Sequence, residues 1–179
     1  MRIISGSYKG RKIIAPKHLP VRPTTDMAKE ALFNILNNQY YFDDITVLDL
    51  FSGTGNISYE FASRGTEQIT AVDNHYGCVQ FINKTAEDFN MPIQAIKRDV
   101  FKFLEQYAKK HTIIFADPPY NFEVEQFATI PQLVFQNDLL DDDGWLIIEH
   151  SKHTDLSHLE HFSDARKYGG SVFSFFVRN

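Results

Sequence analysis

Apolar residues follow two alternating rhythms from residue 45 onward. Short runs rich in β-branched residues predict buried strands, and the segments between them have the spacing of amphipathic helices. The predicted strands lie at 45–50, 68–72, 93–96, 112–116 and 144–149, and the predicted helices at 56–64, 75–89, 100–109 and 123–137. Because nearly continuous apolar strands alternate with helices, we expect a mostly parallel sheet covered on both faces.

The N-terminal end of the chain has a different pattern. Residues 1–23 contain short apolar stretches interrupted by Gly and Ser, followed by an extended segment with three prolines. This composition predicts short strands in a separate β-hairpin or arm. A helix is expected to begin near Thr24-Thr25-Asp26, since threonine caps free amides and aspartate suits the positive end of the helix dipole.

The C-terminal end predicts a hairpin. Residues 161–167 and 171–177 flank Gly169-Gly170, which favours an antiparallel pair of strands. The predicted fold class is therefore α/β and Rossmann-like, with a mostly parallel sheet, a C-terminal antiparallel hairpin and a small basic N-terminal β extension. We expect residues 1–23 to form the arm and residues 24–179 to form the main domain.

Composition narrows the class of protein. The chain of 179 residues fits one domain, and its single cysteine, Cys78, excludes an internal disulfide. No window approaches the roughly 20 apolar residues of a membrane helix, and no leader peptide is recognisable. We expect a cytoplasmic protein without a membrane segment.

The net charge of −5 conceals a strong asymmetry. All 23 acidic residues lie beyond residue 25, whereas the first 25 residues carry only basic charges: Arg2, Lys9, Arg11, Lys12, Lys17 and Arg22. A basic arm on an acidic body is typical of a nucleic-acid contact. A solvated hairpin whose charges serve only solubility has the same pattern, so both interpretations stay open.

Acidic residues stand at the ends of four successive predicted strands: Asp49, Asp73, Asp99 and Asp117. In an open α/β sheet, ligands bind outside the carboxyl ends of the strands. The repetition indicates a ligand site at this edge more strongly than any single acid does.

The first strand leads into a turn with two glycines: Asp49, Phe51, Ser52, Gly53, Thr54 and Gly55. The dinucleotide pattern is incomplete because Ser58 replaces its third glycine, which disfavours a pyrophosphate and favours a cofactor with a carboxylate and a sulfonium. Asp73 lies at a spacing suited to ribose hydroxyls, and Asp99 with Val100 is suited to an adenine. The alternatives are a sterically required glycine turn and two helix caps.

Asp117-Pro118-Pro119-Tyr120 is the most specific motif. Two consecutive prolines fix the backbone, and the residue before them is restricted as well. A carboxylate and the Pro118 carbonyl would then lie side by side next to an aromatic ring. Two fixed acceptors beside a stacking surface suit an exocyclic amine on a planar base. A Pro-rich turn without chemistry is the alternative.

These residues, with others along the chain, resemble a known family: the bacterial small-subunit (16S) ribosomal RNA (guanine-N2)-methyltransferases of the RsmD type. The glycine turn and Asp-Pro-Pro-Tyr occur in many amino-methyltransferases, whereas Arg22-Pro23-Thr24-Thr25-Asp26 is much narrower. The resemblance is carried by Arg2–Gly6, Lys9–Lys12, Arg22–Asp26, Glu30–Asn34, Leu48–Gly55, Ser63–Gly65, Asp117–Tyr120, Ile148-Glu149 and Lys167–Gly169.

The resemblance implies a class I fold that uses S-adenosylmethionine. Residues 51–55 would hold the methionine part of the cofactor, Asp73 its ribose and Asp99 its adenine, while residues 117–120 would receive the guanine. It also implies RNA contacts through Lys9, Arg11, Lys12, Arg22 and Thr24. The expected partner is ribosomal RNA, in the small subunit or its assembly intermediate, and we expect a monomer.

Three further interpretations concern metal and function. The histidines at 150, 153, 158 and 161 match no metal-binding spacing, so we expect a polar loop and no metal. DNA adenine-N6 methylation shares the Asp-Pro-Pro-Tyr chemistry but normally needs a recognition domain. A catalytically silent RNA-binding assembly protein could retain the fold, although the intact motifs disfavour it.

Overall fold

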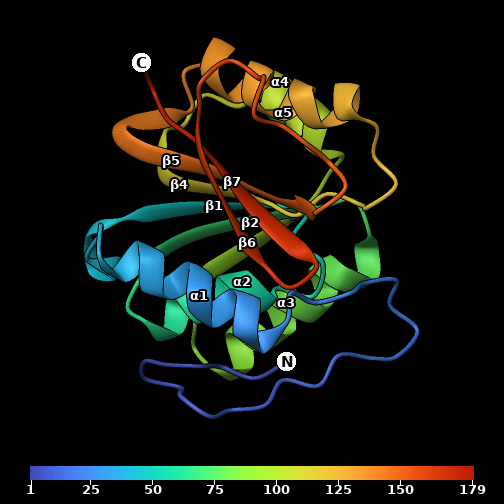
Figure 1. Cartoon of the computed structure of the whole chain (residues 1–179). Coiled ribbons are helices and arrows are strands. Elements are labelled where there is room, and N and C mark those ends of the chain that lie inside the picture. Colours follow the sequence, from blue (N-terminus) through green and yellow to red (C-terminus); the bar gives the residue numbers. More distant parts are fainter.

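A seven-stranded sheet forms the centre of the computed structural model, which describes residues 1–179 (Figure 1). The strand order is β3-β2-β1-β4-β5-β7-β6, in which β1 to β5 run parallel and β7 is antiparallel to both its neighbours. The strands are β1 (Thr46–Leu50), β2 (Gln68–Asp73), β3 (Ile93–Lys97), β4 (His111–Ala116), β5 (Leu140–Ser151), β6 (Phe162–Tyr168) and β7 (Ser171–Phe176). The predicted Rossmann-like fold with a C-terminal hairpin is confirmed.

Helices cover both faces of the sheet (Figure 1). One face carries α1 (Asp26–Asn37), α2 (Asn56–Ser63) and α3 (Tyr76–Asp88), and the other carries α4 (Val100–Gln106) and α5 (Val124–Gln136). A short 3₁₀ helix, Phe42–Asp44, leads into β1. The apolar side chains accordingly form two separate cores, one on each face of the sheet. Strands buried on both faces explain the continuous apolar runs of the sequence.

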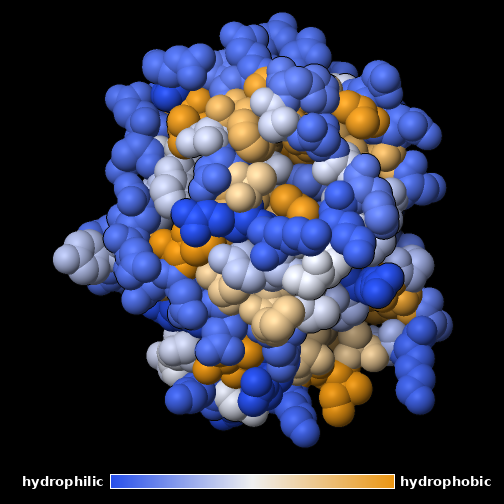
Figure 2. Space-filling view, in the orientation of Figure 1, coloured by the Kyte–Doolittle hydropathy of each residue, from blue (hydrophilic) through white to orange (hydrophobic).

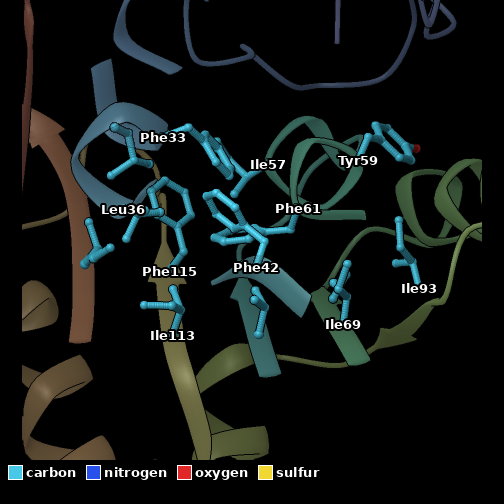
Figure 3. Close-up of a cluster of buried hydrophobic side chains, with 14 of the residues drawn as sticks. Phe33, Leu36, Phe42, Ile57, Tyr59, Phe61, Ile69, Ile93, Ile113 and Phe115 are labelled. Carbon is cyan, nitrogen blue, oxygen red and sulfur yellow. The ribbon is translucent and has the colours of Figure 1, made fainter. Parts of the chain in front are cut away.

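Aromatic rings join α1 and α2 above the sheet (Figure 3). The Phe33 and Phe61 rings meet edge to face with their centroids 4.7 Å apart, and Phe42 lies 5.9 Å from Phe33 and 6.0 Å from Phe61. The Arg64 guanidinium lies 4.8 Å from the Phe33 centroid. This packing fixes the relative position of α1 and α2.

The largest differences from the predicted boundaries lie at the start of β5 and at the end of α4. Strand β5 begins at Leu140 rather than 144, because Leu140 pairs with His111 across an irregularity before the regular register resumes. Helix α4 ends at Gln106 rather than 109, since the backbone of Tyr107 is extended. Both differences arise from tertiary pairing that periodicity does not report.

The N-terminal arm lacks the predicted short strands. It contains a single antiparallel bridge between Arg2 and Lys12, supported by backbone hydrogen bonds from Ile3 to Arg11 and from Ile13 to Met1. Its residues 4–8 also bond to helix α2. The amides of Ile4 and Ser5 donate to the Glu60 carboxylate at 2.8 and 3.1 Å, and that of Ser7 donates to the Ser63 carbonyl at 2.7 Å. The arm is thus a short hairpin-like loop whose residues 4–8 are also bound to α2.

Strand β6 forms one edge of the sheet, and this edge is polar. Its residues 163–167 are exposed. Figure 2 shows mostly hydrophilic residues over this face, with apolar residues in scattered groups. Charged side chains such as Arg166 and Lys167 protect an open edge from pairing with another chain.

Candidate active site

A cavity of about 470 Å³ lies at the carboxyl ends of β1, β2 and β4. This volume suits a medium-sized organic ligand. The sequence-predicted site residues that line it are Arg22, Thr24, Asp49, Phe51, Ser52, Gly53, Thr54, Asp73, Asp99, Val100, Asp117, Pro118, Pro119 and Tyr120. The predicted cofactor and base sites therefore share one cavity.

The glycine turn forms one wall of this cavity. Phe51 and Gly53 both have positive φ angles, 53° and 54°. The left-handed conformation is costly for a phenylalanine, and such strain concentrates at functional sites. The Gly53 amide donates to the Asp73 carboxylate at 2.8 Å, which joins the turn after β1 to the end of β2.

Gly55 has a different role from the one predicted. It is the only residue of the predicted cofactor set that does not line the cavity. Its φ angle is 91°, and a Cβ at this position would lie 2.8 Å from the Tyr59 ring. Gly55 is therefore required by the tight entry into α2 and by the packing of Tyr59.

Asp73 and Asp99 each bind a nearby backbone amide and also line the cavity, so the capping role and the position at a ligand site occur together. Asp73 accepts from the His75 amide at 2.8 Å, and Asp99 caps α4 by accepting from the Lys102 amide at 3.1 Å. Both residues also line the cavity. Local backbone bonds thus orient two carboxyl groups that remain in contact with the ligand-binding space.

Asp49 is a buried acid below the glycine turn, 1% exposed. The Ser58 hydroxyl donates to its carboxylate at 2.6 Å. Burial raises the pKa of Asp49 to about 7, although the bond from Ser58 acts in the opposite direction. A carboxyl that titrates near neutrality responds to a cation placed in the cavity.

The Asp117–Tyr120 turn continues β4 into the cavity. The Asp117 amide donates to the Leu50 carbonyl at 3.3 Å, and Pro118 is buried whereas Pro119 is exposed. Burial, then the neighbouring carboxylates of Glu149 and Asp49, raise the pKa of Asp117 well above its usual range. The half-exposed Tyr120 ring offers a flat surface at the cavity mouth.

The segment between the arm and α1 lies over the cavity. Pro20, Val21, Arg22, Pro23 and Thr24 all line it. The Arg22 guanidinium lies over the Tyr120 ring, 5.7 Å from its centroid. The Thr24 side chain, predicted to contact RNA, is instead 8% exposed, and its hydroxyl donates to the Glu149 carboxylate at 2.6 Å.

Sequence reasoning missed an aromatic cluster of Phe51, Phe101 and Phe122. Phe51 meets Phe122 edge to face at 5.6 Å between centroids, and Phe101 stacks with Phe122 at 6.0 Å. All three residues line the cavity and supply an apolar wall next to Val100. Phe101 follows Val100 and Phe122 lies two residues after Tyr120, so their closeness in sequence to predicted site residues could have indicated them. Asn56, Asn74, His75 and Cys78 were also missed as lining residues.

The basic residues of the arm lie outside the cavity. Lys9, Arg11 and Lys12 are exposed and do not line it. The Arg11 guanidinium lies 5.3 Å from the Phe89 ring centroid and 5.7 Å from that of Tyr8. Only Arg22, of the predicted RNA contacts, combines exposure with a position at the cavity mouth.

The histidine prediction needs one correction. His150 does not lie in a solvated loop: it is 2% exposed on β5, and its Nε2 lies 2.7 Å from the Ser174 hydroxyl. The apolar strand that the sequence predicted to end at 149 continues through it. The structure contains no group of three potential metal ligands, and none of its helices has the length and apolar character needed to cross a bilayer.

Comparison with known proteins assigns the chain to a family. Residues 1–177 match the family described as "Conserved hypothetical protein 95". The small-subunit ribosomal RNA methyltransferase D of Escherichia coli is 32% identical over 150 residues, which cover 83% of this chain and 71% of that protein. This chain belongs to the same family. The family predicted from the sequence is confirmed.

Two further relatives agree with this family. A Bacillus subtilis protein named as a candidate rRNA methyltransferase, YlbH, is 34% identical over 161 residues, covering 87% of this chain and 85% of that protein. The solved structure of yhhF, a candidate methyltransferase of Escherichia coli, superimposes with a TM-score of 0.86 at 27% identity, covering 99% and 97% of the two chains. Together they identify an S-adenosylmethionine-dependent methyltransferase, as predicted.

Proposed function

We propose that this member of the methyltransferase D family methylates the exocyclic N2 amine of one guanine in small-subunit (16S) ribosomal RNA. The observation that carries the proposal is the meeting of three features in one cavity. These are the rigid Asp117–Tyr120 turn, the row of strand-end aspartates, and Arg22 over the Tyr120 ring. The names of the relatives, which refer to ribosomal RNA, support the choice of substrate.

The residues of the cavity fit S-adenosylmethionine. The glycine turn, residues 51–54, would hold its methionine part, and Asp73 would accept from the ribose hydroxyls. Asp99 would accept from the adenine amine, while Val100 and the phenylalanine cluster would contact the ring. Each carboxylate is already oriented by backbone amides, so little ordering is needed on binding.

When bound, the cofactor would supply a methyl group to the amine nitrogen, and the electron pair of the broken carbon–sulfur bond would remain on sulfur. The amine loses one proton in the process. Asp117 and the Pro118 carbonyl would accept the two amine hydrogens and so aim the nitrogen. The raised pKa of Asp117 makes its carboxylate a suitable acceptor for the proton released.

The partner fits the charge distribution. Lys9, Arg11, Lys12 and Arg22 would contact RNA phosphates on the side of the molecule that carries the arm. The proposed substrate is ribosomal RNA within the small subunit or its assembly intermediate. The proposal includes a monomeric enzyme that works in the cytoplasm without a metal, with residues 1–23 as its RNA-binding unit.

Labelled S-adenosylmethionine tests this function. The protein is incubated with naked 16S rRNA, 30S particles or duplex DNA, and the labelled nucleoside is identified after digestion. We expect N2-methylguanosine from an RNA substrate, and no label with Asp117→Ala, which should still bind the cofactor. Label in DNA adenine would favour the alternative DNA enzyme. RNA binding without transfer to any substrate would favour a silent assembly protein.

A further inference from the structure

Glu149 is a buried carboxylate beside the proposed catalytic turn. It is 2% exposed, and it ends the apolar core of β5. Strands β4 and β5 pair in parallel with Ala116 opposite Ile148, so the next residues, Asp117 directly after β4 and Glu149 within β5, lie on neighbouring segments side by side. Glu149 is the first carboxylate among the causes that raise the pKa of Asp117. The two acids therefore interact although Glu149 does not line the cavity.

The position of Glu149 is fixed by a hydrogen-bonded chain from α1 and α2. The Thr24 hydroxyl donates to the Glu149 Oε2 at 2.6 Å. The Thr24 carbonyl accepts from the Asn56 Nδ2 at 3.1 Å, and the Asn56 Oδ1 accepts from the Lys29 Nζ at 2.8 Å. The side chains of all four residues, Thr24, Lys29, Asn56 and Glu149, are buried. A buried, fully connected polar network holds one geometry.

No cation neutralises Glu149. None of the ion pairs in the protein includes it, and the Lys29 ammonium is bound to Asn56, the Arg2 carbonyl and Glu60. The acid beside it is Asp117 at the end of β4, which is in turn close to Asp49 at the end of β1. Burial raises the pKa of Glu149, whereas the hydroxyls of Thr24 and Ser171 lower it. Stability does not explain an unpaired buried acid here, because burial penalises it.

We propose that Glu149 is a positioning residue for methyl transfer, a fixed acid beside the Asp117 carboxyl on the neighbouring strand, with Thr24 as its anchor. This inference rests on the proposed function of Asp117. A negative Glu149 next to Asp117 increases the proton affinity of Asp117. Asp117 then takes the proton released by the amine more readily than an isolated carboxylate would. Thr24 accordingly serves the catalytic carboxyl from inside the protein.

The first test measures the titration of Asp117 in the free protein. Carbon-13 NMR of labelled aspartate, assigned with Asp117→Asn, gives its pKa without any substrate. In Glu149→Gln the pKa of Asp117 should fall by about one unit, because a like charge is removed. Glu125→Gln, an exposed acid on α5, is the matched control and should leave it unchanged. An unchanged Asp117 titration in Glu149→Gln would overturn the inference, whether or not the protein proves to methylate RNA.

The second test measures single-turnover methyl transfer against pH. With Glu149→Gln, the acid limb of the rate profile should move to lower pH and the plateau should fall about tenfold, at unchanged cofactor affinity. If that variant fails to fold, Thr24→Val removes the anchor alone and should slow transfer several-fold, whereas Thr24→Ser recovers the rate. Equal losses in both Thr24 variants would assign the residue to packing and contradict the anchoring role. A wild-type protein inactive on every nucleic acid would instead count against the proposed function.

Discussion

The Arg22 guanidinium lies over the Tyr120 ring, 5.7 Å from its centroid. The two residues come from segments far apart in the chain, the extended stretch before α1 and the turn after β4. A cation over an aromatic face is attracted by the ring quadrupole. The contact therefore joins the proposed phosphate-binding segment to the proposed base-stacking surface at the cavity mouth.

Replacement of Arg22 should weaken RNA binding in a salt-dependent way. Arg22→Met keeps the apolar stem but removes the charge, so the slope of log affinity against log salt should fall by about 0.7 to 0.9, one phosphate contact. Fluorescence anisotropy with a labelled RNA between 50 and 200 mM salt measures it. Lys84→Met, an exposed cation on α3, is the control that should retain the slope. An unchanged slope in Arg22→Met would remove Arg22 from the phosphate contacts.

The arm offers a second electrostatic prediction. Lys9, Arg11 and Lys12 are exposed. Serine at all three positions should lower the slope of log affinity against log salt by the amount that corresponds to about two to three phosphate contacts. Cofactor affinity should stay constant, because none of the three lines the cavity. Isothermal titration with S-adenosylmethionine checks this point. A full salt slope in the triple variant would restore the interpretation of a solvated arm.

The fold and much of the site could be predicted because local signals determine them. Strand periodicity located every parallel strand, and the rule that ligands bind at carboxyl ends of strands placed Asp49, Asp73, Asp99 and Asp117 on one cavity. Proline geometry identified the turn at 117–120. These features depend on residues close together in sequence.

The features that could not be predicted from the sequence depend on contacts between distant segments of the chain. Thr24 and Glu149 are 125 residues apart, and no local pattern indicates that the stretch before α1 reaches the end of β5. Glu149 nevertheless carried the same signal as the four aspartates, an acid at the end of an apolar strand, and the rule was not extended to the fifth strand. The arm was predicted as short strands, and its two halves do pair through one antiparallel bridge, but no local pattern indicates that Glu60 of α2 also binds its backbone.

Asp49 gives a prediction for stability against pH. Its pKa is about 7 in the folded protein and near 3.8 in an unfolded chain, so the folded state binds its proton more tightly. The stability that this group contributes is complete below about pH 4 and is lost as pH rises through 7. Asp49→Asn should remove this loss, so its stability relative to wild type should rise by about 3 kcal/mol between pH 4.5 and pH 8.

Urea unfolding at the two pH values measures this difference. Glu87→Gln, an exposed acid on α3, should show no such pH-dependent gain. Asp117 and Glu149 also have raised pKa values, so wild-type stability should decline with pH by more than the Asp49 contribution. A constant difference between Asp49→Asn and wild type at both pH values would contradict an acid that titrates near neutrality.

Glu60 should prove to be the anchor of the arm. It is fully buried and accepts from the Ile4 and Ser5 amides and from the Arg64 Nε at 2.8 Å, and the Lys29 Nζ lies 3.5 Å away. Glu60→Gln removes the charge and points an amide donor at groups that are themselves donors. The buried Lys29 and the partly buried Arg64 then lose their counter-charge, which costs about 3–5 kcal/mol of unfolding free energy.

The loss should be accompanied by release of the arm. Limited trypsin digestion should cut Glu60→Gln faster than wild type after Lys9, Arg11 and Lys12, since the amides that hold this stretch have lost their acceptor. Glu87→Gln again serves as the control for both stability and cleavage. Destabilisation with an unchanged cleavage rate would mean that the apolar contacts of Ile3 and Ile13, which share the core of α1 and α2, hold the arm without Glu60.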